Sequence, residues 1–125
     1  MNQNILAAVV EDYPDWQEKI QKQLAPHHIQ VVAKATTLAS GLALLPKLHS
    51  LGVSVLILDG ALDKSSRDGD LIGRACHDIA PDILRIGMSR YLDGVTECDM
   101  VVGKENIDDL GETIRSLYQQ KDDTS

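Results

Sequence analysis

The 125-residue sequence has few aromatic residues, no long apolar run and no excess of positive charge. Aromatic side chains make up 3% of the chain and Phe is absent, so a platform of stacked rings for single-stranded nucleic acid is not expected. Every apolar run is much shorter than the roughly 20 residues of a transmembrane helix. The net charge of −7 at pH 7 would repel a phosphate backbone, which argues against non-specific binding to nucleic acid.

Cysteine is also scarce. Cys76 and Cys98 form no close-spaced pair, so we expect two reduced, partly buried thiols of a cytosolic protein. The four histidines share no metal-ligand spacing. Because residues 1–4 do not resemble a signal peptide, the expected location is the cytoplasm. The balance of 43% hydrophobic and 25% charged residues is that of one globular domain, expected at residues 1–120 and followed by a solvated tail at 121–125.

Short apolar runs alternate along the chain with segments of helical periodicity. The runs at 5–10, 31–33, 53–58, 83–88 and 100–103 are predicted to be strands, and the segments after them helices, of which the fourth is at most a stub. Pro46 is expected to kink or shorten the second helix. This alternation is typical of an α/β fold whose parallel sheet is covered on both faces. The helix positions predicted to face inward are Trp16, Ile20, Leu24, Leu38, Leu42, Leu45, Leu48, Leu71, Ile72, Ala75, Ile79, Ile107, Leu110, Ile114 and Leu117.

Polar residues stand where four of the apolar runs end. Glu11 and Asp12 follow the first run, Asp59 the third, Ser89 the fourth and Lys104 the fifth. Parallel strands would bring all of them to the carboxyl edge of the sheet, which is where open α/β sheets bind ligands. Three carboxylates at one edge repel each other, and a hard divalent cation relieves that repulsion. The sequence therefore predicts a Mg²⁺ site held by Glu11, Asp12 and Asp59.

These residue types are suited to phosphoryl transfer. Asp59 would use one carboxylate oxygen as a metal ligand and the other as the nucleophile. Lys104 is a compact point charge that can neutralise a phosphoryl oxygen, and Ser89 can donate a hydrogen bond to another. Protein groups in phosphoryl transfer mainly position the reactants and stabilise charge, so this set suffices for the reaction.

The same residues, in this order and at these strand ends, resemble the receiver domain (CheY-like) of bacterial two-component response regulators. The resemblance extends over nearly the whole chain, from about residue 5 to residue 118, and includes the stretch 35–59. It implies a doubly wound, five-stranded parallel sheet with strand order 2-1-3-4-5. It also implies that the backbone carbonyl of Ala61 is a further metal ligand.

The resemblance further implies how such a protein works. A phosphohistidine on a sensor histidine kinase or phosphotransfer protein donates the phosphoryl group to Asp59, and the aspartyl phosphate changes contacts with an unknown downstream protein. Such a domain is not a metabolic enzyme, because it catalyses only its own phosphorylation and dephosphorylation. No direct contact with nucleic acid and no membrane insertion are expected.

Several features depart from the family pattern. Val101 stands where the family usually has Tyr or Phe, and Arg90 follows Ser89 where a small residue is usual. Only 15 positions separate Ser89 from Lys104, a spacing shorter than usual by about two helical turns, which predicts a shortened or irregular fourth helix. These departures motivate an alternative hypothesis, in which the chain is a pseudo-receiver that binds partners without being phosphorylated.

Two other classes of protein share parts of this pattern. A phosphohydrolase of the haloacid-dehalogenase type needs a second Asp two positions after its nucleophile, where this chain has Ala61. A nucleotide-binding protein needs a glycine-rich loop after the first strand, and the sequence has none there. Trp16 is expected in the core, with a partner contact beside the acidic pair as its alternative role.

Overall fold

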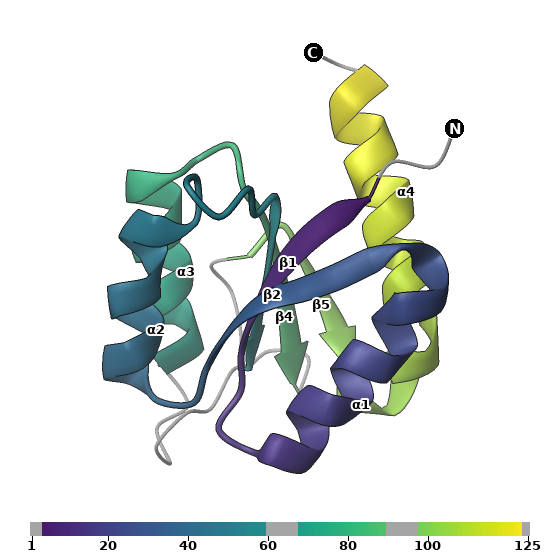
Figure 1. The fold of residues 1–125 in the computed structure, drawn as a ribbon, viewed down its shortest axis with the longest axis horizontal. Coiled ribbons are helices and arrows are strands. Elements are labelled where there is room, and N and C mark those ends of the chain that lie inside the picture. Colours follow the sequence, from purple (N-terminus) through teal and green to yellow (C-terminus); the bar gives the residue numbers. More distant parts are fainter. Residues whose placement is uncertain (1–3, 60–67, 90–97, 124–125) are drawn as a thin grey trace.

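The computed structural model describes residues 4–59, 68–89 and 98–123 (Figure 1). Within these ranges, five strands and four α-helices follow one another in the predicted order, with short 3-10 helices at Ala25–His27, Leu45–Lys47 and Lys104–Asp109. The strands and helices are β1 (Ile5–Val10), α1 (Pro14–Leu24), β2 (Ile29–Ala35), α2 (Leu38–Leu44), β3 (Val55–Asp59), α3 (Asp68–Ile79), β4 (Leu84–Ser89), β5 (Met100–Gly103) and α4 (Leu110–Asp123).

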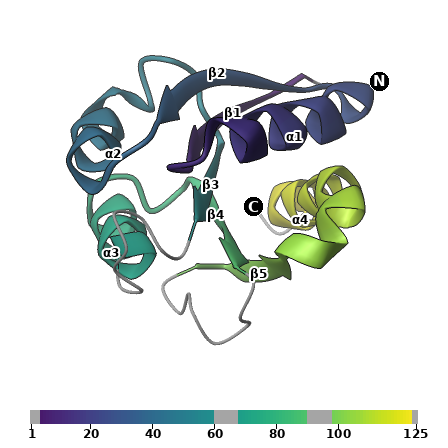
Figure 2. The ribbon, with the colours of Figure 1, turned by 90° about the horizontal axis from the view of Figure 1, so that it is seen from below.

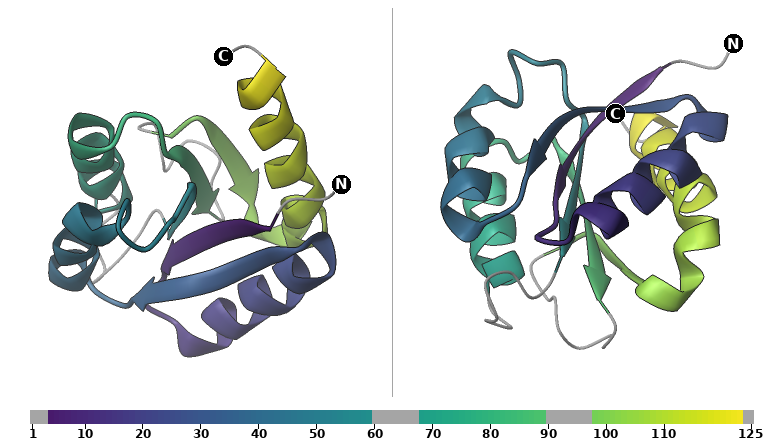
Figure 3. Two further views of the ribbon diagram at one scale, coloured as in Figure 1. Left: turned by 45° about the horizontal axis from the view of Figure 1, so that its top comes forward. Right: turned by 60° about the horizontal axis from the view of Figure 1, so that its bottom comes forward.

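The strands form one parallel sheet in the order β2-β1-β3-β4-β5, which confirms the predicted fold class. Helices α1 and α4 cover one face of the sheet, and α2 and α3 cover the other (Figure 2). β1 begins and α4 ends on the same side of the molecule, away from the carboxyl edge (Figure 3). The last paired residues at the carboxyl edge are Val10 with Leu58, Asp59 with Met88, and Ser89 with Gly103.

The core has one layer on each face of the sheet. Ile57 and Ile86 pack with α1 and α4, whereas Leu56 and Leu58 pack with α2 and α3. Every residue of β3 is buried, because this central strand is covered on both faces. The central position of β3 explains why the residues before Asp59 form an almost continuous apolar run.

The ends of the first two helices follow from local sequence. Pro14 occupies the first turn of α1, where its missing N–H and fixed φ cost nothing. Thr37 and Ser40 form a reciprocal capping box at the start of α2. α2 ends at Leu44 and continues as a 3-10 turn, because Pro46 cannot supply a helical N–H. The predicted shortening of this helix is confirmed.

Some predicted inward positions are wrong. Leu42 is 38% exposed, Leu71 52% and Ile79 50%, although each is apolar. α3 instead buries Ile72 and Cys76, four positions apart on one face of the helix. Leu71 is next to Ile72 in sequence and so points about 100° away from it around the helix, outside the stripe that Ile72 and Cys76 form.

The boundaries of the other elements differ modestly from the prediction. β2 begins at Ile29 and β3 at Val55, each two residues from its predicted start. The last helix proper begins at Leu110, after a 3-10 segment, and continues to Asp123, which lies within the segment expected as a tail. The predicted short fourth helix falls almost wholly on residues 90–97, outside the described residues.

Both cysteines lie in the described ranges, and neither forms a disulfide there. Cys76 is fully buried and Cys98 is half-buried. Burial raises the pKa of the Cys98 thiol to about 12, so at neutral pH it is an unreactive thiol that packs beside α3. None of the helices in the described ranges combines the length and the apolar character needed to span a bilayer.

Candidate functional site

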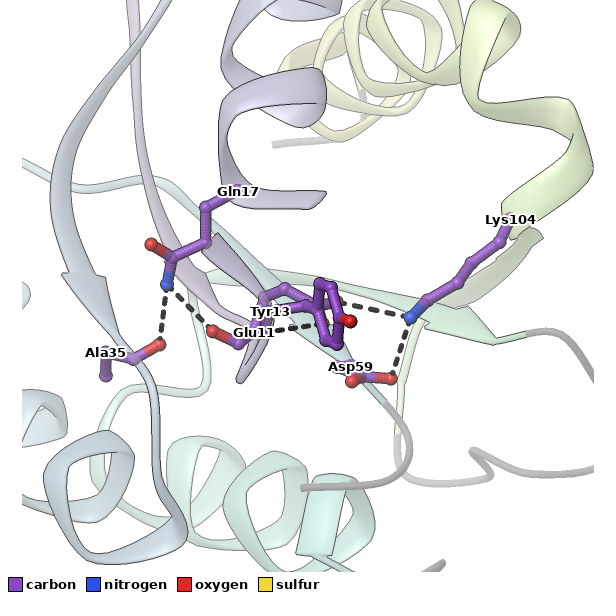
Figure 4. A network of polar contacts seen from close by, with 6 residues as sticks. All are labelled: Glu11, Tyr13, Gln17, Ala35, Asp59 and Lys104. Atoms are coloured by element: carbon purple, nitrogen blue, oxygen red, sulfur yellow. Dashed lines mark hydrogen bonds and ion pairs between the residues drawn. The ribbon is translucent and has the colours of Figure 1, made fainter. Parts of the chain in front are cut away.

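Glu11, Asp59 and Lys104 meet at the carboxyl edge of the sheet (Figure 4). Glu11 follows β1, Asp59 ends β3 and Lys104 follows β5. The Lys104 ammonium nitrogen lies 3.4 Å from Glu11 Oε2 and 3.5 Å from Asp59 Oδ1. The ammonium is therefore shared between two carboxylates that belong to neighbouring strands.

Asp12 completes a group of three carboxylates. Glu11, Asp12 and Asp59 each offer an oxygen within 4.8 Å of the others. Glu11 and Asp59 are buried, whereas Asp12 is exposed, so the group opens to solvent on one side. Oxygen donors that converge in this way are the ligands that Mg²⁺ prefers.

Glu11 is the most deeply buried of the three carboxylates, with 1% of its surface exposed. Its Oε1 accepts a hydrogen bond of 3.2 Å from the Tyr13 N–H. Among the described residues, none donates a hydrogen bond to its Oε2. The pKa of Glu11 is raised from 4.5 to about 8, chiefly by burial and then by the charge of Asp59, while the ammonium of Lys104 opposes both effects. One ammonium is thus too little positive charge to keep the whole group ionised at neutral pH.

The side chain of Gln17 fixes the backbone next to the site. Its side-chain amide nitrogen donates hydrogen bonds to the carbonyl of Glu11 at 2.8 Å and to that of Ala35 at 3.0 Å. These bonds tie the first turn of α1 to the ends of β1 and β2. Nothing in the sequence marks this residue, because a glutamine in an amphipathic helix has no pattern that separates it from a surface residue.

Trp16 lies beside the site and is half-buried. Its ring centroid is 5.0 Å from the Lys104 ammonium and 4.7 Å from that of Lys19. It is absent from both core layers, so the expectation of a core residue is wrong. Its position is close to the acidic pair, as the alternative proposed, but its observed partners are two lysines of this chain.

The remaining predicted residues are described in part or not at all. Ser89 closes β4 and pairs with Gly103, so its backbone lies at the same edge as Asp59. Ala61 and Arg90 fall outside the described residues. Val101 is half-buried in β5 and pairs with Gly87.

Comparison with known proteins finds similarity in structure but not in sequence. No family model and no curated protein matches the chain. Solved structures of response regulators do match. The chain has the receiver-domain fold.

Three of the matching structures show how far the likeness extends. The RcsB response regulator of Salmonella typhimurium is 22% identical, with a TM-score of 0.77 over 96% of this chain. The isolated receiver domain of RcsB from Salmonella enterica serovar Typhimurium, in the presence of the phosphomimetic BeF₃⁻, is 22% identical, with a TM-score of 0.75 over 94% of this chain. The non-phosphorylated receiver domain of Escherichia coli RcsB is 23% identical, with a TM-score of 0.76 over 94% of this chain. This chain spans 62% of the first RcsB chain but 90% and 95% of the two receiver-domain chains.

Proposed function

We propose that the chain is a phosphoryl-accepting receiver domain of a two-component system, with Asp59 as the acceptor. The observation that carries the proposal is the Lys104 ammonium held between Asp59 and the buried Glu11 at the carboxyl edge of a sheet with the receiver fold. A nucleophilic carboxylate, a metal-binding acid and a fixed cation are the groups that phosphoryl transfer needs.

A divalent cation fits this site. The three carboxylates converge within 4.8 Å, and the buried Glu11 Oε2 has no hydrogen-bond donor among the described residues. Glu11, Asp12 and Asp59 would hold Mg²⁺, and the resemblance adds the carbonyl of Ala61. When bound, Mg²⁺ neutralises charge on the carboxylates and on the phosphoryl oxygens.

The proposed reaction moves one phosphoryl group from nitrogen to oxygen. A carboxylate oxygen of Asp59 attacks the phosphorus of a phosphohistidine. The P–O bond forms as the P–N bond breaks, and the imidazole nitrogen leaves with the electron pair and takes a proton from solvent. Lys104, already 3.5 Å from Asp59, offsets the negative charge of the product, and Ser89 donates a hydrogen bond to it. Attack by water on the phosphorus later restores Asp59 and releases inorganic phosphate.

The partners follow from this chemistry. The phosphohistidine belongs to a sensor histidine kinase or a phosphotransfer protein in the cytoplasm. The phosphoryl group carries nearly two negative charges and replaces the single charge of the Asp59 carboxylate, which alters the surface that a downstream protein contacts. RcsB has been solved bound to DNA, but the net charge of −7 on this chain supports action through protein contacts instead.

Intact-protein mass measurement tests the proposal. The chain is incubated with a small phosphodonor, such as phosphoramidate, with Mg²⁺ or with EDTA. We expect one phosphoryl group to be gained, to require Mg²⁺, to be absent in Asp59→Asn and to persist in Asp15→Asn, which removes an exposed carboxylate from α1. Fluoroberyllate forms a stable mimic of the aspartyl phosphate, so its binding tests the site even if the phosphoryl adduct hydrolyses too quickly to be weighed. If the protein neither gains the group nor binds fluoroberyllate, the proposal is wrong and the pseudo-receiver hypothesis is favoured.

A further inference from the structure

The Lys104 ammonium has a third neighbour besides the two carboxylates. Trp16 places its ring centroid 5.0 Å from the nitrogen, inside the roughly 6 Å range in which an aromatic face attracts a cation. The lysine side chain is 12% exposed, so little water competes for the ammonium. Tryptophan is the aromatic residue that attracts cations most strongly.

The backbone that holds Trp16 is fixed to the same strand ends as the carboxylates. The Trp16 N–H donates to the Tyr13 carbonyl at 3.1 Å in the first turn of α1. The next residue, Gln17, bonds to the backbone of Glu11 and of Ala35. The distance from the ring to Lys104 is therefore set by the folded edge of the sheet.

The ring and the carboxylates attract the ammonium in chemically different ways. Carboxylate oxygens attract any cation, so a metal ion bound to Glu11 and Asp59 weakens their attraction for Lys104. An indole face offers no ligand atom to a hard cation such as Mg²⁺, so its attraction for the ammonium persists when the metal binds.

We propose that Trp16 is a positioning residue for Lys104, whose ammonium it keeps beside Asp59 when a metal ion occupies the carboxylates. This inference rests on the proposed function. Trp16 would touch neither the metal nor the phosphoryl group, and would act through Lys104, which neutralises the phosphoryl group.

Phosphorylation rates of Trp16 variants test the inference. With phosphoramidate and saturating Mg²⁺, Trp16→Leu should react about 3- to 10-fold more slowly than the wild type. Trp16→Phe, which keeps an aromatic face, should recover most of the lost rate. The matched control is Tyr118→Leu, which truncates a partly buried ring packed on the core and should stay within about twofold of the wild type. In a Lys104→Met background, Trp16→Leu should cause no further loss, because the two residues act together.

Fluorescence of the metal-free protein gives a readout independent of phosphorylation. Trp16 is the single tryptophan of the chain, so its emission reports its own surroundings. Lys104→Met should shift or intensify that emission, because it removes a cation from the ring. Lys19→Gln removes the other cation, 4.7 Å away, and should change the emission without changing the phosphorylation rate.

The outcomes separate this inference from the proposed function. If the wild type is phosphorylated and folded Trp16→Leu matches its rate, the positioning role is wrong and the receiver function stands. Unchanged emission in Lys104→Met would also overturn the contact, even if Trp16→Leu failed to fold. If the wild type itself neither reacts nor binds fluoroberyllate, the proposed function fails, and the positioning role fails with it.

Discussion

Binding of Mg²⁺ to this site is expected to strengthen steeply as the pH rises toward 8, because the metal must displace a proton from Glu11. Burial, and then the charge of Asp59, raise the pKa of this carboxyl from 4.5 to about 8. The folded protein thus holds a proton that the unfolded chain has lost, so the metal-free fold loses stability as the pH rises between these two values. Mg²⁺ binds the ionised carboxylate, so its affinity rises over the same range.

The size of the effect follows from the position of that pKa. With a pKa of about 8, roughly one Glu11 side chain in a hundred is ionised at pH 6 and about half are ionised at pH 8. The apparent affinity for Mg²⁺ should therefore rise about 50-fold between these conditions. At pH 7 each metal ion should release about 0.9 proton.

Titration calorimetry in two buffers with different ionisation enthalpies measures both the affinity and the protons released. The control is Glu11→Gln, which retains all four histidines but removes this carboxyl. It should bind Mg²⁺ weakly and with little dependence on pH. An affinity that changes less than about threefold from pH 6 to pH 8, without proton release, would refute the reasoning. It would mean that Lys104 already keeps Glu11 ionised in the metal-free protein.

Three substitutions test other parts of the structure by urea unfolding. At pH 9, where Glu11 is ionised, Asp59→Asn should stabilise the metal-free protein by about 1 kcal/mol by relieving carboxylate repulsion, whereas Asp15→Asn should not. A loss of stability in Asp59→Asn would contradict the crowded site. Gln17→Leu should cost about 2 kcal/mol because two buried carbonyls lose their donor; a loss below about 0.5 kcal/mol would indicate that water replaces it. Gly41→Ala should cost about 1 kcal/mol, because the added Cβ would lie 2.8 Å from Ile72 Cδ1. Adding Ile72→Val, which deletes that methyl, should recover part of this loss, and no recovery would locate the strain elsewhere.

Several elements of the fold were predictable because local residues decide them. The five apolar runs became five strands, since an almost uninterrupted apolar run is typical of a strand buried on both faces. Pro46 acts within one helical turn, so the early end of α2 followed from sequence. The order of the strands came from the family resemblance, because periodicity alone does not say which strands are neighbours.

The composition of the candidate site was predictable for a related reason. Glu11, Asp59 and Lys104 each stand at the end of a strand, and parallel strands bring their carboxyl ends to one edge. That rule brings residues nearly a hundred positions apart to one place without any knowledge of side-chain packing. It does not give their distances, their burial or their protonation.

Those properties were decided only by the tertiary structure. Leu71 and Ile79 face outward although they are apolar, because the face that α3 turns to the sheet depends on its packing and not on its composition. Gln17 bonds to the backbone of Glu11, and Trp16 lies beside Lys104. Both contacts arise because the first turn of α1 lies against strand ends, one of which is distant in sequence. The sequence by itself determined which chemical groups reach the carboxyl edge. The tertiary packing around that edge decided which carboxylates are buried and what surrounds the lysine, since burial and charge depend on distances between segments that local sequence does not specify.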